Sequence, residues 1–161
     1  MPDKIKDDKS DSANVAINPP VAYVLAVAAA FALNWFHPLA FLPPAFPGIW
    51  IGVALMAAGL LFARWAITSL QRARTTVFPG GSTRAIVDSG AYGVSRNPIY
   101  LAAMLGMIGL ALAFDTLWIF IMAVPLYFVI RFGVVGREEA YLARKFGAPY
   151  LEYKSRVRRW L

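Results

Sequence analysis

Long runs of apolar residues constrain this chain more than any other feature of its sequence. Residues 21–35 and 99–114 contain no Asp, Glu, Lys or Arg, and residues 46–70 and 117–135 contain one arginine each. A helix that crosses a bilayer needs ~20 mostly apolar residues. The sequence therefore predicts an all-α integral membrane protein with four transmembrane helices, over about residues 21–41, 46–70, 99–114 and 117–135.

The composition supports a membrane protein and excludes several kinds of chemistry. Hydrophobic residues make up 59% of the chain and charged residues 16%, whereas soluble domains carry roughly 25% charged residues. Because the chain has no cysteine, it has no disulfide, no thiolate metal site and no cysteine nucleophile. His37 is the single histidine, so we expect no metal site.

The distribution of lysine and arginine predicts how the four helices are oriented. Apart from Arg64, these residues precede the first helix, lie between the second and third, or lie near and beyond the end of the fourth. The connections 36–45 and 115–116 contain none. Because positive residues collect on the cytoplasmic side of a membrane, we expect a protein of the cytoplasmic (inner) membrane with both termini cytoplasmic. This orientation also accounts for the net charge of +7, so no nucleic-acid partner is predicted.

The chain divides into a tail and one domain. Residues 1–18 mix Lys, Asp and Ser without apolar periodicity, which is typical of a disordered cytoplasmic tail. Residues 19–161 form a single membrane domain, which ends in a cytoplasmic amphipathic helix and tail over residues 136–161. Residues 71–97 form one long cytoplasmic connection with a flexible turn at 78–82. Loops of this length are usually functional or disordered, and the apolar residues of this one favour an ordered, functional loop.

The segment Gly90–Tyr100 places many hydrogen-bonding groups where the third helix begins. Pro98 suits the first turn of a helix, where its missing N–H costs nothing. Arg96, Asn97 and Tyr100 surround that helix start. They form either a helix cap with interfacial anchors or a site for a polar or anionic ligand, and the residues alone do not decide between the two.

Glu138 and Glu139 form an adjacent acidic pair just after the fourth helix. They are either a solvated helix start, where acids favour the helix dipole, or carboxylates that bind an ammonium group or a ribose hydroxyl; their spacing does not choose. Further on, Trp160 stands beside Arg158 and Arg159, a combination that suits the headgroup layer of an anionic leaflet.

Two blocks of the sequence together resemble the isoprenylcysteine carboxyl methyltransferase and phospholipid methyltransferase superfamily of integral membrane enzymes. The first block is Ile86-Val87-Asp88-Ser89-Gly90-Ala91-Tyr92 followed by Arg96-Asn97-Pro98-Ile99-Tyr100-Leu101. The second is Glu138-Glu139-Ala140-Tyr141-Leu142, then Phe146-Gly147-Ala148-Pro149-Tyr150 and Tyr153-Lys154-Ser155-Arg156-Val157. The resemblance covers roughly residues 75–161, with a membrane hairpin between the blocks.

The resemblance implies methyl transfer from S-adenosylmethionine, with S-adenosylhomocysteine as product, to a lipidic or small hydrophobic acceptor that enters from the membrane. It places the cofactor contacts at Arg84, Ala85, Ile86, Val87, Tyr92, Asn97, Pro98, Ile99 and Tyr100. It also matches Glu138 to the family's substrate-side glutamate, with Glu139 beside it. Some relatives carry an arginine one helical turn before the paired acids, where this chain has Val134; Arg131 or Arg137 is the candidate replacement. The implied catalytic set is Glu138, Glu139 and Arg131.

Two other functions compete with this prediction. Membrane sterol reductases share a related C-terminal architecture and use NADPH, although they are usually much longer. A non-catalytic membrane scaffold, or a degenerate relative, would bind neither cofactor well. The acceptor also stays open between a prenylated cysteine, a phospholipid amine, a thiol and an isoprenoid acid.

Overall fold

The computed structural model describes residues 13–76 and 83–161, and within these ranges the chain contains helices and no strand. The all-helical architecture predicted from the apolar runs is therefore confirmed. The predicted flexible turn at 78–82 and residues 1–12 of the predicted tail lie outside the described residues. The elements in chain order are α1 (Pro19–Phe36), α2 (Gly48–Arg72), α3 (Ala91–Val94), α4 (Pro98–Ala113), α5 (Leu117–Ile130), the π-helical turn η1 (Arg131–Val135), α6 (Gly136–Phe146) and α7 (Ala148–Arg156).

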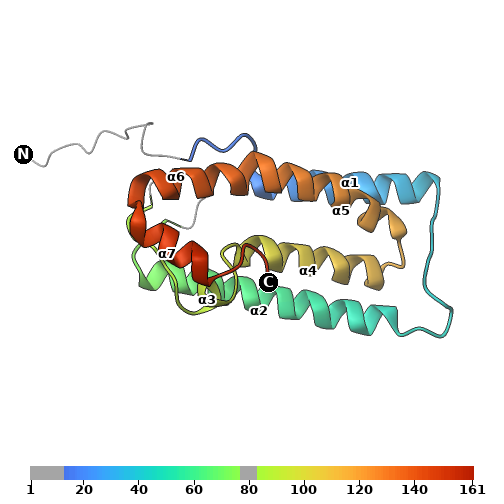
Figure 1. Ribbon diagram of the computed structural model, residues 1–161. Coiled ribbons are helices and arrows are strands. Elements are labelled where there is room, and N and C mark those ends of the chain that lie inside the picture. The colour runs from blue at the N-terminus through green and yellow to red at the C-terminus, as the bar shows by residue number, and fades with distance from the viewer. Residues whose placement is uncertain (1–12, 77–82) are drawn as a thin grey trace, which may run out of the picture.

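The long helices form two pairs that lie side by side (Figure 1). Helix α1 runs along α5, and α2 runs along α4, while α4 and α5 join the pairs. Small residues allow the second pair to approach closely, as membrane helices commonly do. At Gly52 and Gly109 the two backbones are so near that a Cβ atom added to Gly109 would lie 2.6 Å from the carbonyl oxygen of Gly52.

Three helices of the described chain are long and apolar enough to cross a membrane: α1, α2 and the continuous helix Leu117–Phe146. Helix α4 has 16 residues, fewer than the ~20 that a span normally needs, so its role as a fourth span stays a prediction. The outer faces of these helices expose large apolar side chains such as Leu60 and Leu61, which are 73% and 68% exposed. Surfaces of this kind suit contact with lipid.

A compact polar cluster ties together the connections at one end of the bundle. The side chain of Asp115 accepts hydrogen bonds of 2.9 Å from the backbone N–H groups of both Phe41 and Leu42. Thr116 donates to the side chain of Asn34. The loop between α1 and α2 is thereby fixed to the turn between α4 and α5, at the end opposite α6 and α7 (Figure 1).

The fourth predicted span continues into the predicted C-terminal helix without a break. Helix α5 passes through η1 directly into α6, which stops at Gly147. Gly147 has φ +60°, a conformation that glycine adopts without steric cost. The last residues of the predicted tail lie against this helix, because the N–H of Ala16 donates to the carbonyl of Gly133 at 3.0 Å.

Candidate functional site

A cavity of about 490 Å³ lies at the end of the bundle where α3, α6 and α7 gather. Its volume is within the range of small-molecule sites, roughly 300–1,000 Å³. Several elements that are distant in sequence contribute to its walls. The lining residues are Ala13, Pro19, Pro20, Tyr23, Ile67, Leu70, Thr76, Thr83, Ala85, Ile86, Val87, Tyr92, Arg96, Asn97, Pro98, Ile99, Tyr100, Ala103, Glu138, Glu139, Tyr141, Leu142, Tyr150 and Tyr153.

The cavity combines two kinds of surface. Helices α1 and α2 face it mainly with apolar groups, including Pro19, Ile67 and Leu70. The turn before α4 and the start of α6 face it with the charged side chains of Arg96, Glu138 and Glu139. A ligand that has both a polar and an apolar part matches such a lining.

Glu138 lines this cavity and is held by a tyrosine. Its two carboxylate oxygens each accept a hydrogen bond of 3.2 Å from the hydroxyl of Tyr100. Tyr100 is itself buried, and its carbonyl accepts a hydrogen bond from Tyr23 of α1. Within residues 13–76 and 83–161 Glu138 forms no ion pair. Its carboxyl group is therefore available to a ligand.

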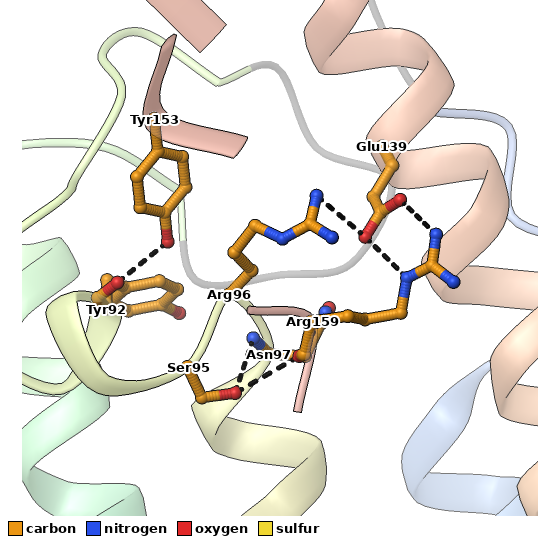
Figure 2. A network of polar contacts seen from close by, with 7 residues as sticks. All are labelled: Tyr92, Ser95, Arg96, Asn97, Glu139, Tyr153 and Arg159. Atoms are coloured by element: carbon orange, nitrogen blue, oxygen red, sulfur yellow. Dashed lines mark hydrogen bonds and ion pairs between the residues drawn. The ribbon is translucent and has the colours of Figure 1, made fainter. Parts of the chain in front are cut away.

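Glu139, the next residue, has the opposite environment. Arg159 donates to both of its carboxylate oxygens, from Nε at 2.8 Å to Oε1 and from Nη2 to Oε2. Arg96 Nη1 lies 3.3 Å from the same Oε1 (Figure 2). Successive residues of an α-helix point about 100° apart, so the two acids of the pair face different neighbours. Glu139 is held by two arginines, and Glu138 is held by a tyrosine.

The C-terminal segment, residues 157–161, is hydrogen-bonded to the turn that precedes α4. The carbonyl of Arg159 accepts hydrogen bonds from the side chains of Ser95 at 3.2 Å and Asn97 at 3.1 Å. The N–H of Arg96 donates to the carbonyl of Arg158. Asn97 occupies the N-cap position of α4, where its side chain makes no capping bond, and its Nδ2 holds the C-terminal segment instead.

Tyrosines of α7 close the wall beside α3. The hydroxyl of Tyr153 donates to the carbonyl of Tyr92 at 2.8 Å (Figure 2). Burial raises the pKa of the Tyr153 hydroxyl well above its usual range. The group therefore stays protonated and keeps this hydrogen bond at any physiological pH.

The structure brings most of the predicted site residues to one cavity. The predicted residues that line it are Ala85, Ile86, Val87, Tyr92, Asn97, Pro98, Ile99, Tyr100, Glu138 and Glu139. Arg84 is exposed outside the lining, and its N–H donates to Thr75. Arg131 also lies outside, with its guanidinium 5.3 Å from the ring centroid of Phe132. Roles for Arg84 and Arg131 stay predictions.

Sequence reasoning missed several residues of this site. Tyr23, Tyr150 and Tyr153 line the cavity. Tyr23 is an isolated tyrosine in an apolar helix and gives no distinctive signal, whereas Tyr150 and Tyr153 stood in the second block of the family resemblance but were not assigned to the site. Arg159 stood in a basic, aromatic segment that indicated a membrane surface. Its ion pair with Glu139 joins residues 20 positions apart through a turn and a second helix, and sequence spacing does not reveal such a contact.

Comparison with known proteins identifies the family. A model of the phospholipid methyltransferase family matches residues 47–149, more than half of the 161-residue chain. The chain belongs to the phospholipid methyltransferase family. The predicted membership of this superfamily of membrane methyltransferases is thereby confirmed, and the family name points to a lipid-type substrate. Neither the curated proteins nor the solved structures contain a match.

Proposed function

We propose that this protein transfers a methyl group from S-adenosylmethionine to a lipidic or small hydrophobic acceptor, in the manner of an isoprenylcysteine carboxyl methyltransferase-like enzyme. The observation that carries the proposal is one cavity whose lining has a polar part and an apolar part, here called its polar end and its apolar end. The polar end includes Arg96, Glu139 and Glu138, which forms no ion pair within residues 13–76 and 83–161, and the apolar end is formed by α1 and α2, two of the candidate membrane-spanning helices. A polar methyl donor and an apolar acceptor can meet in such a cavity.

The residues of the polar end fit the methyl donor. S-adenosylmethionine is a cation that supplies an activated methyl group on a sulfonium sulfur. Glu138 presents a carboxylate with no ion-pair partner among the described residues, which suits a sulfonium or ammonium centre. Ile86, Val87 and Tyr92 offer apolar and aromatic surface to a purine ring.

Positioning is the main task of the protein in a reaction of this kind. The methyl group is already activated, so the walls must hold donor and acceptor in line and exclude water. Tyr100 fixes the carboxylate of Glu138 through its hydroxyl. For an amine acceptor, we propose that Glu138 takes up the proton that the amine must lose; a carboxylate acceptor needs no base, and Glu138 then acts only on the methyl donor. Glu139 and Arg131 complete the proposed catalytic set. Glu139 contributes by lining the cavity, where Arg96 and Arg159 hold its carboxylate.

The acceptor has a direct route from the membrane. Because α1 pairs with α5 and α2 pairs with α4, the apolar end of the cavity lies between the pairs, with Pro20 and Tyr23 on one side and Ile67 on the other. Pro20 is exposed, and Tyr23 and Ile67 are half-buried. We propose that an apolar chain enters between α1 and α2.

Filling this route selectively impairs use of the acceptor. We expect Ile67→Trp to raise the KM for a lipid acceptor by about tenfold or more. The larger indole takes up space that the bound acceptor chain would fill, and overpacking an apolar space is costly. The affinity for S-adenosylhomocysteine changes less than about twofold, because the polar end is untouched. Steady-state kinetics and calorimetry measure the two effects. Leu61→Trp, on the exposed outer face of α2, is the matched control, and an equal effect of both variants contradicts the route.

We further propose that the site faces the cytoplasm, in the inner membrane, with both termini on that side; the arginine and lysine distribution supports this. Because the chain has no cysteine, single-cysteine variants report the orientation directly. A membrane-impermeant maleimide is expected to label Leu39→Cys in intact cells and Lys154→Cys after permeabilisation only. Both positions are exposed. Labelling of Lys154→Cys in intact cells contradicts the proposed orientation.

The decisive experiment combines binding with product identification. Purified protein is titrated with S-adenosylhomocysteine and with NADPH, and is then incubated with methyl-labelled S-adenosylmethionine and membrane extract. We expect binding of the first ligand only, and a labelled lipid-phase product that mass spectrometry identifies as a prenylcysteine ester, a phospholipid or another acceptor. Binding of NADPH favours a reductase, and binding of neither ligand favours a scaffold.

A further inference from the structure

Arg96 is the most unusual charged residue of the cavity. Its side chain is only 9% exposed, and it lines the cavity from the turn before α4. Its Nε and Nη1 atoms are buried and have no hydrogen-bond partner in the described parts of the chain. Nη1 has one charged neighbour, the Glu139 oxygen at 3.3 Å, but this contact lacks hydrogen-bond geometry.

A buried guanidinium with free donors is costly. Arginine carries five N–H donors in a planar fork, and each buried donor left unsatisfied costs about 1–3 kcal/mol. Native proteins satisfy most such groups, and exceptions occur where a ligand supplies the missing acceptor. The planar fork matches the two oxygens of a carboxylate or a phosphate.

Arg159 leaves the positive charge of Arg96 available to a ligand, because Arg159 pairs with Glu139. Both carboxylate oxygens of Glu139 already accept hydrogen bonds from Arg159. The cluster of two arginines and one glutamate therefore retains one positive charge, and Arg96 carries the donors that are free. Without Arg159, the charge of Glu139 would fall on Arg96 alone.

We propose that Arg96 binds an oxyanion, a carboxylate or a phosphate, on a ligand of the cavity, and that Arg159 neutralises Glu139 so that Arg96 is free to do so. Two sources of the oxyanion share this chemistry: the carboxylate of the methyl donor, which rests on the proposed function, and the phosphate of a lipid, which does not. The first source also matches Glu138, which forms no ion pair in the described residues and can bind an ammonium group. An amino-acid group carries both an ammonium and a carboxylate.

Paired ligands distinguish the sources. S-adenosylhomocysteine carries the amino-acid group, and 5′-methylthioadenosine lacks it. If the donor supplies the oxyanion, Arg96→Gln weakens the binding of S-adenosylhomocysteine by about tenfold or more, as expected for loss of a charge-assisted pair, and leaves methylthioadenosine unchanged. If a lipid supplies it, the variant weakens dihexanoyl phosphatidic acid and leaves dihexanoylglycerol and both nucleosides unchanged.

Other outcomes overturn the inference. Equal losses for both members of a pair show that Arg96 only supports the wall, and unchanged binding of all four ligands shows that it binds no oxyanion. Arg144→Gln removes an exposed arginine of α6 and is the matched control. Wild-type protein that binds neither nucleoside contradicts the proposed methyl donor, while the lipid pair still tests Arg96.

A second set of variants tests Arg159 separately from folding. We expect Arg159→Gln to weaken binding of the same oxyanion ligand about tenfold, because Glu139 then competes for Arg96. Adding Glu139→Gln removes the competitor and restores affinity to within about threefold of wild type. A double variant that stays as weak as Arg159→Gln overturns the role given to Arg159. Thermal unfolding of each variant confirms that the protein is folded.

Discussion

Gly52→Ala is expected to destabilise the protein by about 2–3 kcal/mol, the upper part of the range for overpacking. A Cβ atom at Gly52 would lie 2.6 Å from the backbone nitrogen of Ala113 and still nearer to the carbonyl oxygen of Gly109. Both are backbone atoms of α4, which cannot rotate out of the way. The two helices must therefore move apart along their contact, and the cavity wall formed by α2 and α4 moves with them.

Gly106→Ala is the matched control for this prediction. Gly106 lies on α4 as well, but no atom lies within 4 Å of a Cβ added there. The same substitution gains helix propensity, up to about 1 kcal/mol in a helix interior, so Gly106→Ala leaves stability unchanged or raises it. Thermal unfolding in detergent, followed by tryptophan fluorescence, measures both variants. Equal unfolding temperatures would contradict the close α2–α4 contact.

Local chemistry made much of the fold predictable. Apolar runs located the long helices, because a helix in lipid needs a continuous apolar surface and the sequence alone shows such runs. The first predicted span extended to residue 41, whereas α1 ends at Phe36 and the residues after it connect α1 to α2. Pro98 begins α4 as predicted, since proline suits the first turn of a helix, and Gly147 ends α6, since glycine adopts the required backbone conformation. The predicted third span, residues 99–114, matches α4 to within one residue at each end, and the 16 residues of α4 fall short of a full crossing.

The candidate site was predictable in composition but not in connections. The motif residues were identified together, yet Asn97 gave no sign that its amide would bind the carbonyl of Arg159, 62 positions away. The adjacent acids likewise looked equivalent. Their difference arises only when the helix through η1 sets which carboxylate meets Tyr100 and which meets Arg159. Long-range contacts of this kind depend on the complete fold.

Glu138→Gln is expected to lower kcat for methyl transfer by about 10²-fold or more, within the usual range for loss of an acid–base group. Glutamine has nearly the same shape and still accepts a hydrogen bond from Tyr100. What it lacks is a carboxyl group that can take up a proton or carry a negative charge. Single-turnover kinetics with saturating S-adenosylmethionine measures the chemical step without product release.

The adjacent acid provides the sharpest contrast. Glu139→Gln leaves Arg159 and Arg96 without their counter-charge, so we expect a loss of stability of about 3 kcal/mol for a broken buried pair, with kcat reduced far less than in Glu138→Gln. Glu152→Gln, an exposed acid on α7, changes neither quantity. If Glu138→Gln lowers stability and spares kcat while Glu139→Gln does the reverse, the two roles are exchanged. The carboxylate that reacts would then be the one held by two arginines. We do not expect this, because a charge already neutralised within the protein adds little to the binding of a ligand.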